Sequence, residues 1–292
     1  MKMKKYVLDL RVGGVERVSE RHVLLRLTDP QRALPEMVAG QFVEVRVDGA
    51  DHTFLRRPVS IHFVDRQANE LWLLVAMVGE GTRRLGELKA GQTLNCVLPL
   101  GNGFTMPAEA QSPAETQGPA EAQSPAEAQR PAEAQRSAEV PGAGYCRPLL
   151  VGGGVGVAPL LFLGAQLSER GVEPTFLLGG RTAKDVLGLD RFGRYGRVCV
   201  TTEDGSAGER GFVTNHTVLG EAFDHIAMCG PTPMMKAVAR VAMERGIDCE
   251  ASLENMMACG LGACLCCVEK TREGNLCVCK EGPVFNVKRL LW

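Results

Sequence analysis

The cysteines near the C-terminus constrain this chain more than any other feature of its sequence. Six of the eleven cysteines lie between positions 259 and 279, and Cys259, Cys264 and Cys267 follow the spacing C-x4-C-x2-C. Plant-type [2Fe–2S] sites use this spacing and take their fourth thiolate from further along the chain. Structural zinc usually takes two C-x2-C-like pairs, so the first gap of four residues favours an iron–sulfur cluster over zinc.

The residues between these cysteines suit a cluster-binding loop. Gly260 and Gly262 permit tight turns and leave backbone N–H groups free to bond sulfur. Either Cys277 or Cys279 could supply the fourth ligand, and the spacing does not choose between them. Cys266 is then a bystander.

Composition places the chain among globular proteins of the cytoplasm. It has 292 residues, enough for two domains and a small appendage, and its net charge of −1 predicts no binding to nucleic acid or to a membrane surface. The basic start resembles a signal peptide, but Asp9 and Arg11 come before any apolar region, and no apolar run approaches a membrane span. We therefore expect a cytoplasmic protein whose cysteines are not in disulfides.

Residues 1–105 predict a six-stranded antiparallel barrel. Apolar and β-branched runs alternate with Gly, Pro, Asp and Asn, without long helical periods between them. One helix is expected after a glycine turn, over Thr82–Leu88. The predicted strands are Tyr6–Val12, His22–Thr28, Gln41–Val47, Pro58–Phe63, Leu71–Val78 and Thr93–Leu98.

Residues 106–142 have a different composition. The unit Pro-Ala-Glu-Ala-Gln recurs every six residues, with only Met106 and Val140 as bulky apolar side chains. Such a segment cannot bury enough apolar surface to offset its ordering entropy, so we predict a disordered or loosely helical insertion.

Residues 143–247 predict a doubly wound parallel sheet, because strands and helices alternate. Residues 248–292 are short, rich in cysteine and loop-like, and are expected to form a small cluster-binding domain. The predicted elements of the sheet region are strands Pro148–Val151, Thr175–Leu178, Arg197–Thr201 and His225–Cys229, and helices Ala158–Arg170 and Thr232–Arg245.

Two motifs in the barrel indicate a flavin site. Arg57-Pro58-Val59-Ser60 offers a guanidinium for a pyrophosphate and a hydroxyl on the flavin side. About twenty residues on, Gly79-Glu80-Gly81-Thr82 opens the expected helix, where N–H groups and a hydroxyl could receive phosphate. Each motif is weak alone, and Pro99–Phe104 at the end of the barrel is interpreted as structural.

Two further turns indicate a nucleotide site at the carboxyl edge of the sheet. Glycines after the first strand would let the backbone approach a dinucleotide, and a Cys-Gly-Pro turn follows a later strand. Glu203 and Asp204 could accept from a ribose diol, which weakly favours NAD over NADP. The candidate residues are Gly153, Gly154, Gly156, Cys229, Gly230 and Pro231.

These motifs, in this order, resemble the ferredoxin–NADP reductase superfamily, and within it the electron-transfer subunits of type 1B dihydroorotate dehydrogenase. The resemblance covers nearly the whole chain except 106–142. That insertion and Cys266 depart from the family pattern. The residues that carry the resemblance are Leu55–Ser60, Gly79–Thr82, Pro99–Phe104, Met257–Cys264 and Val278–Phe285.

The resemblance implies cofactors and a fourth ligand. In this family the last cysteine stands just before a stretch like Lys-Glu-Gly-Pro-Val-Phe, which implies Cys279 as the ligand and Cys277 as a bystander. FAD would lie on the barrel, with Arg57 and Thr82 at its phosphates and Ser60 near the flavin. NAD would dock at 153–156 and 229–231.

The resemblance also implies a partner and a pathway. An FMN-containing catalytic subunit would oxidise dihydroorotate in pyrimidine biosynthesis, within a heterotetramer of two catalytic and two electron-transfer subunits. Electrons would pass from FMN through the cluster and FAD to NAD, since a flavin can join a one-electron carrier to a hydride acceptor. The alternatives are another NAD(P)H-linked complex (of sulfide dehydrogenase, ferredoxin–NAD(P) transhydrogenase or hydrogenase type), a redox-sensing binding protein, and a zinc-stabilised adaptor.

Overall fold

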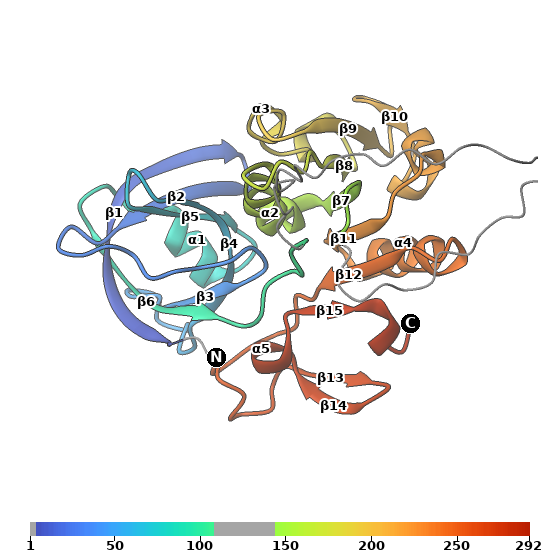
Figure 1. Cartoon of the computed structure of the whole chain (residues 1–292). Helices are drawn as coiled ribbons and strands as arrows, with labels where there is room; N and C mark the ends of the chain where they lie inside the picture. Colours follow the sequence, from blue (N-terminus) through green and yellow to red (C-terminus); the bar gives the residue numbers. More distant parts are fainter. Residues whose placement is uncertain (1–3, 108–143) are drawn as a thin grey trace, which may run out of the picture.

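The computed structural model describes residues 4–107 and 144–292 (Figure 1). Nearly all of the predicted repeat insertion lies outside these residues, so its conformation stays a prediction. No helix in the described ranges is long and apolar enough to cross a membrane.

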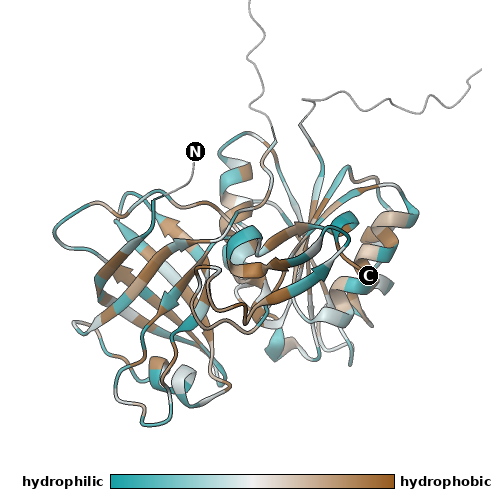
Figure 2. Cartoon of the chain, turned by 90° about the horizontal axis from the view of Figure 1, so that it is seen from below, coloured by the Kyte–Doolittle hydropathy of each residue, from teal (hydrophilic) through white to brown (hydrophobic). Residues whose placement is uncertain are grey.

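The N-terminal part is a closed antiparallel barrel, which confirms the predicted six strands. Its strand order is β1-β2-β5-β4-β3-β6. Hydrophobic and hydrophilic stretches both occur along its strands in Figure 2, as expected where one face of each strand lines the core. Its elements are β1 (Tyr6–Ser19), β2 (His22–Thr28), β3 (Phe42–Val45), β4 (Arg57–Asp65), β5 (Glu70–Ala76), α1 (Glu80–Gly86) and β6 (Thr93–Leu100).

Strand β1 is twice as long as predicted. Its first half pairs with β6 and its second half with β2, with a register shift between Val12 and Gly14. A bulge of this kind lets one strand turn a corner of a barrel, so the glycines that suggested the end of a strand instead bend it.

The second part is a seven-stranded sheet in the order β10-β9-β8-β7-β11-β12-β15. All its pairs are parallel except β12 with β15. The strands are β7 (Pro148–Gly153), β8 (Thr175–Gly180), β9 (Arg197–Thr202), β10 (Glu209–Arg210), β11 (His225–Cys229), β12 (Asp248–Ser252) and β15 (Val284–Asn286).

Helices cover both faces of this sheet, as predicted for a doubly wound fold. Leu150 of β7 packs in one core with α2 (Ala158–Ser168), whereas Leu149 packs in a second core with α4 (Thr232–Glu244). Successive residues of a strand face opposite sides, so β7 is buried on both faces. The shorter helices are η1 (Gly154–Val157), η2 (Ala183–Asp185), α3 (Leu189–Phe192), η3 (Val213–Asn215), η4 (Thr217–Gly220) and η5 (Val287–Arg289).

The sheet continues past the expected boundary at 247/248. Strand β12 pairs with β11 over its whole length, and β15 then pairs with β12. The cysteine-rich composition hid these two short strands. Between them the chain leaves the sheet to form the hairpin β13 (Val268–Thr271) and β14 (Gly274–Cys277) and the short helix α5 (Val278–Glu281).

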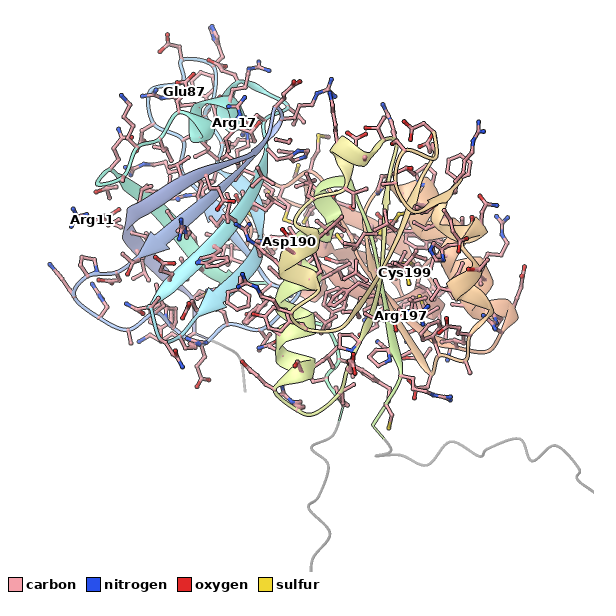
Figure 3. The ribbon with its side chains drawn as sticks, turned by 90° about the horizontal axis from the view of Figure 1, so that it is seen from above. Arg11, Arg17, Glu87, Asp190, Arg197 and Cys199 are labelled. Carbon is pink, nitrogen blue, oxygen red and sulfur yellow. The ribbon has the colours of Figure 1, made fainter. Side chains whose placement is uncertain are left out.

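Helix α2 lies between the barrel and the sheet (Figures 1 and 3). The ring centroids of Phe162 on α2 and Phe63 on β4 are 6.0 Å apart, with an edge-to-face angle of 67° between the rings. Arg191 of α3 donates to Glu16 of β1 at 2.7 Å. The barrel is thus packed against the sheet. The cluster segment leaves the sheet between β12 and β15, at the edge opposite β10, and also contacts the barrel.

Candidate functional site

The four predicted ligand cysteines lie together as two pairs. The Cys279 backbone N–H donates to Cys267 Sγ at 3.3 Å, and Cys264 is close enough to Cys259 to help lower the pKa of its thiol. The first pair is buried, whereas Cys259 is half-buried and Cys264 exposed. Gly262 links the pairs, because its N–H donates to Cys279 Sγ at 3.1 Å.

Backbone donors favour the thiolate form at the start of this loop. Burial opposes ionisation of Cys259, but the N–H groups of Leu261 and Ala263, at 3.3 and 3.4 Å from its Sγ, help to lower its pKa to about 6. Burial raises the pKa of Cys279 to about 12. A bound metal would therefore favour the thiolate form of Cys279.

The glycines of the loop have no room for a side chain. Gly260 and Gly262 have φ of +65° and +81°, and a Cβ on Gly262 would lie 2.8 Å from Lys280 Cδ. In residues 4–107 and 144–292, no three His, Cys, Asp or Glu side chains gather as ligands of one metal ion would. Two thiol pairs with N–H donors at their sulfurs fit a two-iron cluster, in which each iron takes two protein thiolates.

The two cysteines that competed for the fourth position differ in their surroundings. Cys279 contacts Gly262 and Cys267 as described, whereas Cys277 pairs with Val268 in the hairpin. The Cys277 backbone N–H donates to the Glu281 carboxylate at 2.9 Å.

The barrel holds the chain immediately after Cys279. The Asn102 backbone N–H donates to the Gly282 carbonyl at 2.6 Å, and the Asn102 side chain donates to the Lys280 and Glu281 carbonyls at 3.2 and 3.0 Å. A Cβ on Gly101 would clash with Pro283 Cδ. The motif Pro99–Phe104, interpreted from the sequence as structural, therefore fixes the position of the segment that carries Cys279.

A cavity of about 230 Å³ lies beside the cluster segment. One wall comes from the barrel and includes Pro58, Val59 and Ser60 of β4 and Thr82 of α1. The other walls come from the nucleotide turn after β7 and from the residues just before Cys259. The latter include Glu254, Asn255 and Met257.

The predicted flavin residues take different parts. Arg57 donates to the Leu55 carbonyl at 2.9 Å, and its Nε lies 3.2 Å from where a Cβ on Gly81 would be. The Thr82 hydroxyl accepts from the backbone N–H groups of Val78 and Gly79, both at 3.0 Å. The hydroxyl of Thr82 thus shapes the Gly79–Thr82 turn.

The two predicted nucleotide turns touch at the carboxyl edge of adjacent strands. A Cβ on Gly156 would lie 2.5 Å from Gly230 Cα and 2.6 Å from the Cys229 carbonyl oxygen. A Cβ on Gly153 would lie 2.7 Å from Met234 Sδ and 3.0 Å from Pro231 Cδ, so this glycine also packs against the second turn. Gly154 has φ of +57° and nothing within 4 Å of a Cβ, so it faces open space.

Asp204 takes a local structural part at the end of β9. Its Oδ1 accepts from the backbone N–H and the hydroxyl of Ser206, at 2.9 and 2.6 Å, and these bonds lower its pKa. Glu203 is exposed at the same edge.

Two carboxylates of the site region did not stand out in the sequence. Glu254 lies on the cavity wall, where desolvation raises the pKa of its carboxyl. Cys229 Sγ is 3.8 Å from Glu254 Oε1. Glu44 of β3 is 1% exposed and contacts the cluster loop. The position of Glu254, five residues before Cys259, could have suggested from the sequence that it lies near the cluster. No sequence pattern links Glu44 to the cluster segment.

Comparisons with known proteins agree with this geometry. A family model described as the iron-sulfur cluster binding domain of dihydroorotate dehydrogenase B matches residues 254–291. The oxidoreductase NAD-binding domain matches residues 150–240, and a repeat of unknown function matches residues 107–134.

Solved structures share the fold. The structure described as the NADH-dependent reduced ferredoxin-NADP oxidoreductase superposes with a TM-score of 0.76, at 27% identity over 97% of this chain and 90% of that one. The flavohem-like FAD/NAD binding domain of nitric oxide dioxygenase from Vibrio cholerae superposes with a TM-score of 0.59, at 18% identity over 83% of this chain and 97% of that one.

Barrel, parallel sheet and cysteine segment together define an NAD-linked iron–sulfur oxidoreductase with the fold of ferredoxin reductases. Relatives named dihydroorotate dehydrogenase B (NAD(+)), electron transfer subunit, are 35% identical in Fusobacterium nucleatum and 37% in Bacillus velezensis. These matches cover 84% of both chains and 86% of both chains, respectively. The chain belongs to this family of electron transfer subunits, which confirms the resemblance seen in its sequence.

Proposed function

We propose that this chain carries electrons from a dihydroorotate-oxidising catalytic subunit to NAD. The observation that carries the proposal is the short connection between the two candidate cofactor sites. Asn255 and Met257 line the cavity beside the flavin motif, and Cys259 follows two residues later. The cluster exchanges single electrons and the flavin one or two, so that together they can serve a hydride acceptor such as NAD.

The cluster ligands in this proposal are Cys259, Cys264, Cys267 and Cys279. The contacts of Cys279 with Gly262 and Cys267 support it over Cys277 as the fourth ligand. Backbone N–H groups already aimed at these sulfurs would stabilise the thiolates of a bound cluster.

The barrel would hold FAD against the cavity. Arg57 supplies a guanidinium next to the Gly79–Thr82 turn, where it can pair with a pyrophosphate. Pro58, Val59 and Ser60 line the cavity and would contact the flavin. Thr82 would contribute by ordering the turn, since its hydroxyl is bonded within that turn.

The touching turns of the sheet would receive NAD. Gly153, Gly154 and Gly156 carry no side chains, and Gly154 faces open space, so that backbone at these positions can approach the dinucleotide. Cys229, Gly230 and Pro231 form the second turn, which closes against the first.

The cluster loop would face the partner, which we propose is an FMN-containing catalytic subunit in a heterotetramer of two subunits of each kind. Apolar side chains around this loop are exposed to solvent: Met256 by 84%, Leu261 by 48% and Leu265 by 64%. Leu265 has φ of +60°, an uncommon conformation for a bulky residue. Grouped exposed apolar residues are typical of protein contact surfaces. We place the complex in the cytoplasm, where thiols stay reduced.

A direct test uses the assembled complex. The chain is co-expressed with an FMN-containing, dihydroorotate-oxidising subunit, and NAD reduction by dihydroorotate is followed with the wild type and with Cys279→Ser and Cys277→Ser. We expect Cys279→Ser to abolish the reaction and the cluster absorbance, and Cys277→Ser to retain both. A complex that binds both cofactors but never reduces NAD would contradict the proposal.

A second candidate function is supported by the superposition on the NADH-dependent reduced ferredoxin-NADP oxidoreductase. In that case the chain would serve another NAD(P)H-linked complex. Reduction of ferredoxin by NADH or NADPH, without any response to dihydroorotate, would favour this alternative.

A further inference from the structure

Glu44 is a buried acid that the barrel does not need. It lies on β3 between Val43 and Val45, whose side chains belong to the barrel core, so its own side chain faces outward. It is nevertheless 1% exposed, and neither carboxylate oxygen has a hydrogen-bond partner among the described residues. Burying an unpaired carboxyl costs stability, so an apolar residue would suit the fold better.

The cluster loop covers this carboxyl. A Cβ on Gly260 would lie 2.7 Å from Glu44 Cγ and 3.2 Å from Glu44 Oε1. Glu44 therefore lies against the backbone of the residue that follows Cys259. The second glycine of the loop, Gly262, faces Lys280 instead of an acidic side chain.

Arg56 and Arg57 both lie near Glu44, but neither is hydrogen-bonded to its carboxylate. Arg56 donates to the Glu44 backbone carbonyl at 3.3 Å, to the Asn95 carbonyl at 3.1 Å and to Asn95 Oδ1 at 2.5 Å. It thus holds the β3 backbone and Asn95, and no hydrogen bond joins it to the Glu44 carboxylate. Burial raises the pKa of Glu44 to about 7, although Arg56 opposes this.

We propose that Glu44 is a positioning residue through which the barrel supports Gly260 and sets the reduction potential of the cluster. The inference rests on the proposed function. Charge and burial around an iron–sulfur cluster tune its potential. A carboxylate beneath the loop opposes the addition of an electron to the cluster. The packing of Glu44 under Gly260 fixes the distance between this negative charge and the cluster.

The test compares Glu44→Gln, which keeps the shape, Glu44→Met, which fills the space without polar atoms, and Glu44→Asp, which restores the charge. Glu20→Gln, at an exposed turn of the barrel, is the matched control. Iron, sulfide and FAD are quantified, and the cluster potential is measured by a redox titration followed by electron paramagnetic resonance at pH 9.

We expect Glu44→Gln and Glu44→Met to keep the cofactors and to raise the potential, with an about tenfold higher ratio of reduced to oxidised cluster at a fixed ambient potential. Glu44→Asp should fall between the wild type and Glu44→Gln. If Glu44→Gln and Glu44→Met titrate like Glu20→Gln, the inference is wrong while the proposed function stands. A wild-type chain without a cluster signal would overturn both.

Discussion

Substitution of Gly156 by alanine tests the contact between the two nucleotide turns. The added Cβ would lie 2.5 Å from Gly230 Cα and 2.6 Å from Gly230 N and the Cys229 carbonyl oxygen, closer than such atoms approach. All three are backbone atoms, so no side chain can rotate away and the turns must separate. Overpacking of this kind costs about 1–3 kcal/mol of unfolding free energy.

We expect Gly156→Ala to lower the melting temperature by roughly 2–4 °C per kcal/mol lost. The KM for NADH in dye reduction should rise about tenfold, which corresponds to about 1.4 kcal/mol of binding free energy. FAD and iron content should not change, because the atoms nearest the added Cβ all belong to the second turn and not to the barrel or the cluster loop.

Gly220→Ala is the matched control, because nothing lies within 4 Å of its Cβ. Both variants are assayed by thermal unfolding and by steady-state reduction of an artificial acceptor by NADH. If Gly156→Ala matches Gly220→Ala in melting temperature and in KM, the two turns do not depend on their close contact.

Three further predictions follow from other contacts. Arg57→Ala should weaken FAD binding about 10- to 100-fold, as expected for one charge-assisted contact, whereas exposed Arg11→Ala (Figure 3) should leave FAD titrations unchanged. Burial lowers the pKa of His225, but Asp248 and Glu250, at 3.6 and 3.5 Å, raise it by more than burial lowers it. The pKa of His225 in the folded state therefore lies above its ordinary value. The charged His225 thus stabilises the fold below the unfolded-state pKa of about 6.5, and this contribution disappears as pH rises through the higher folded-state pKa. Denaturant unfolding should show that loss in the wild type and not in His225→Gln. Deleting 107–140 should leave flavin and iron content unchanged, because the Tyr145 hydroxyl donates to the Thr105 carbonyl at 2.8 Å and holds the flanking ends together; lower cofactor content would show otherwise.

Local sequence patterns predicted those helices and strands for which the hydrophobic period and the flanking turn residues indicate the same bounds. Strand β2 was predicted residue for residue, and the helices α2 and α4 within one or two residues. Strand β1 was predicted too short, because Gly13 and Gly14 form a bulge instead of a turn. The pairing of β12 with β15 joins residues about 35 positions apart, and no local pattern reports such a contact.

The same limit applies to the candidate site. Spacing brought out the cysteines, and glycine motifs brought out the turns. The chemistry of Thr82, whose hydroxyl is bonded within its own turn, depends on the conformation that the turn adopts. Glu44 reads as an ordinary outward-facing residue of a strand, and only the tertiary structure shows that the cluster loop covers it.

The antiparallel pairing of β15 with β12 bears on how the ligand cysteines are brought together. The cysteine segment begins and ends on neighbouring strands of one sheet, and Asn102 fastens it near its end. The strand pairing and the Asn102 contacts close this segment into a loop, so folding offsets much of the entropy cost of bringing the distant ligands together.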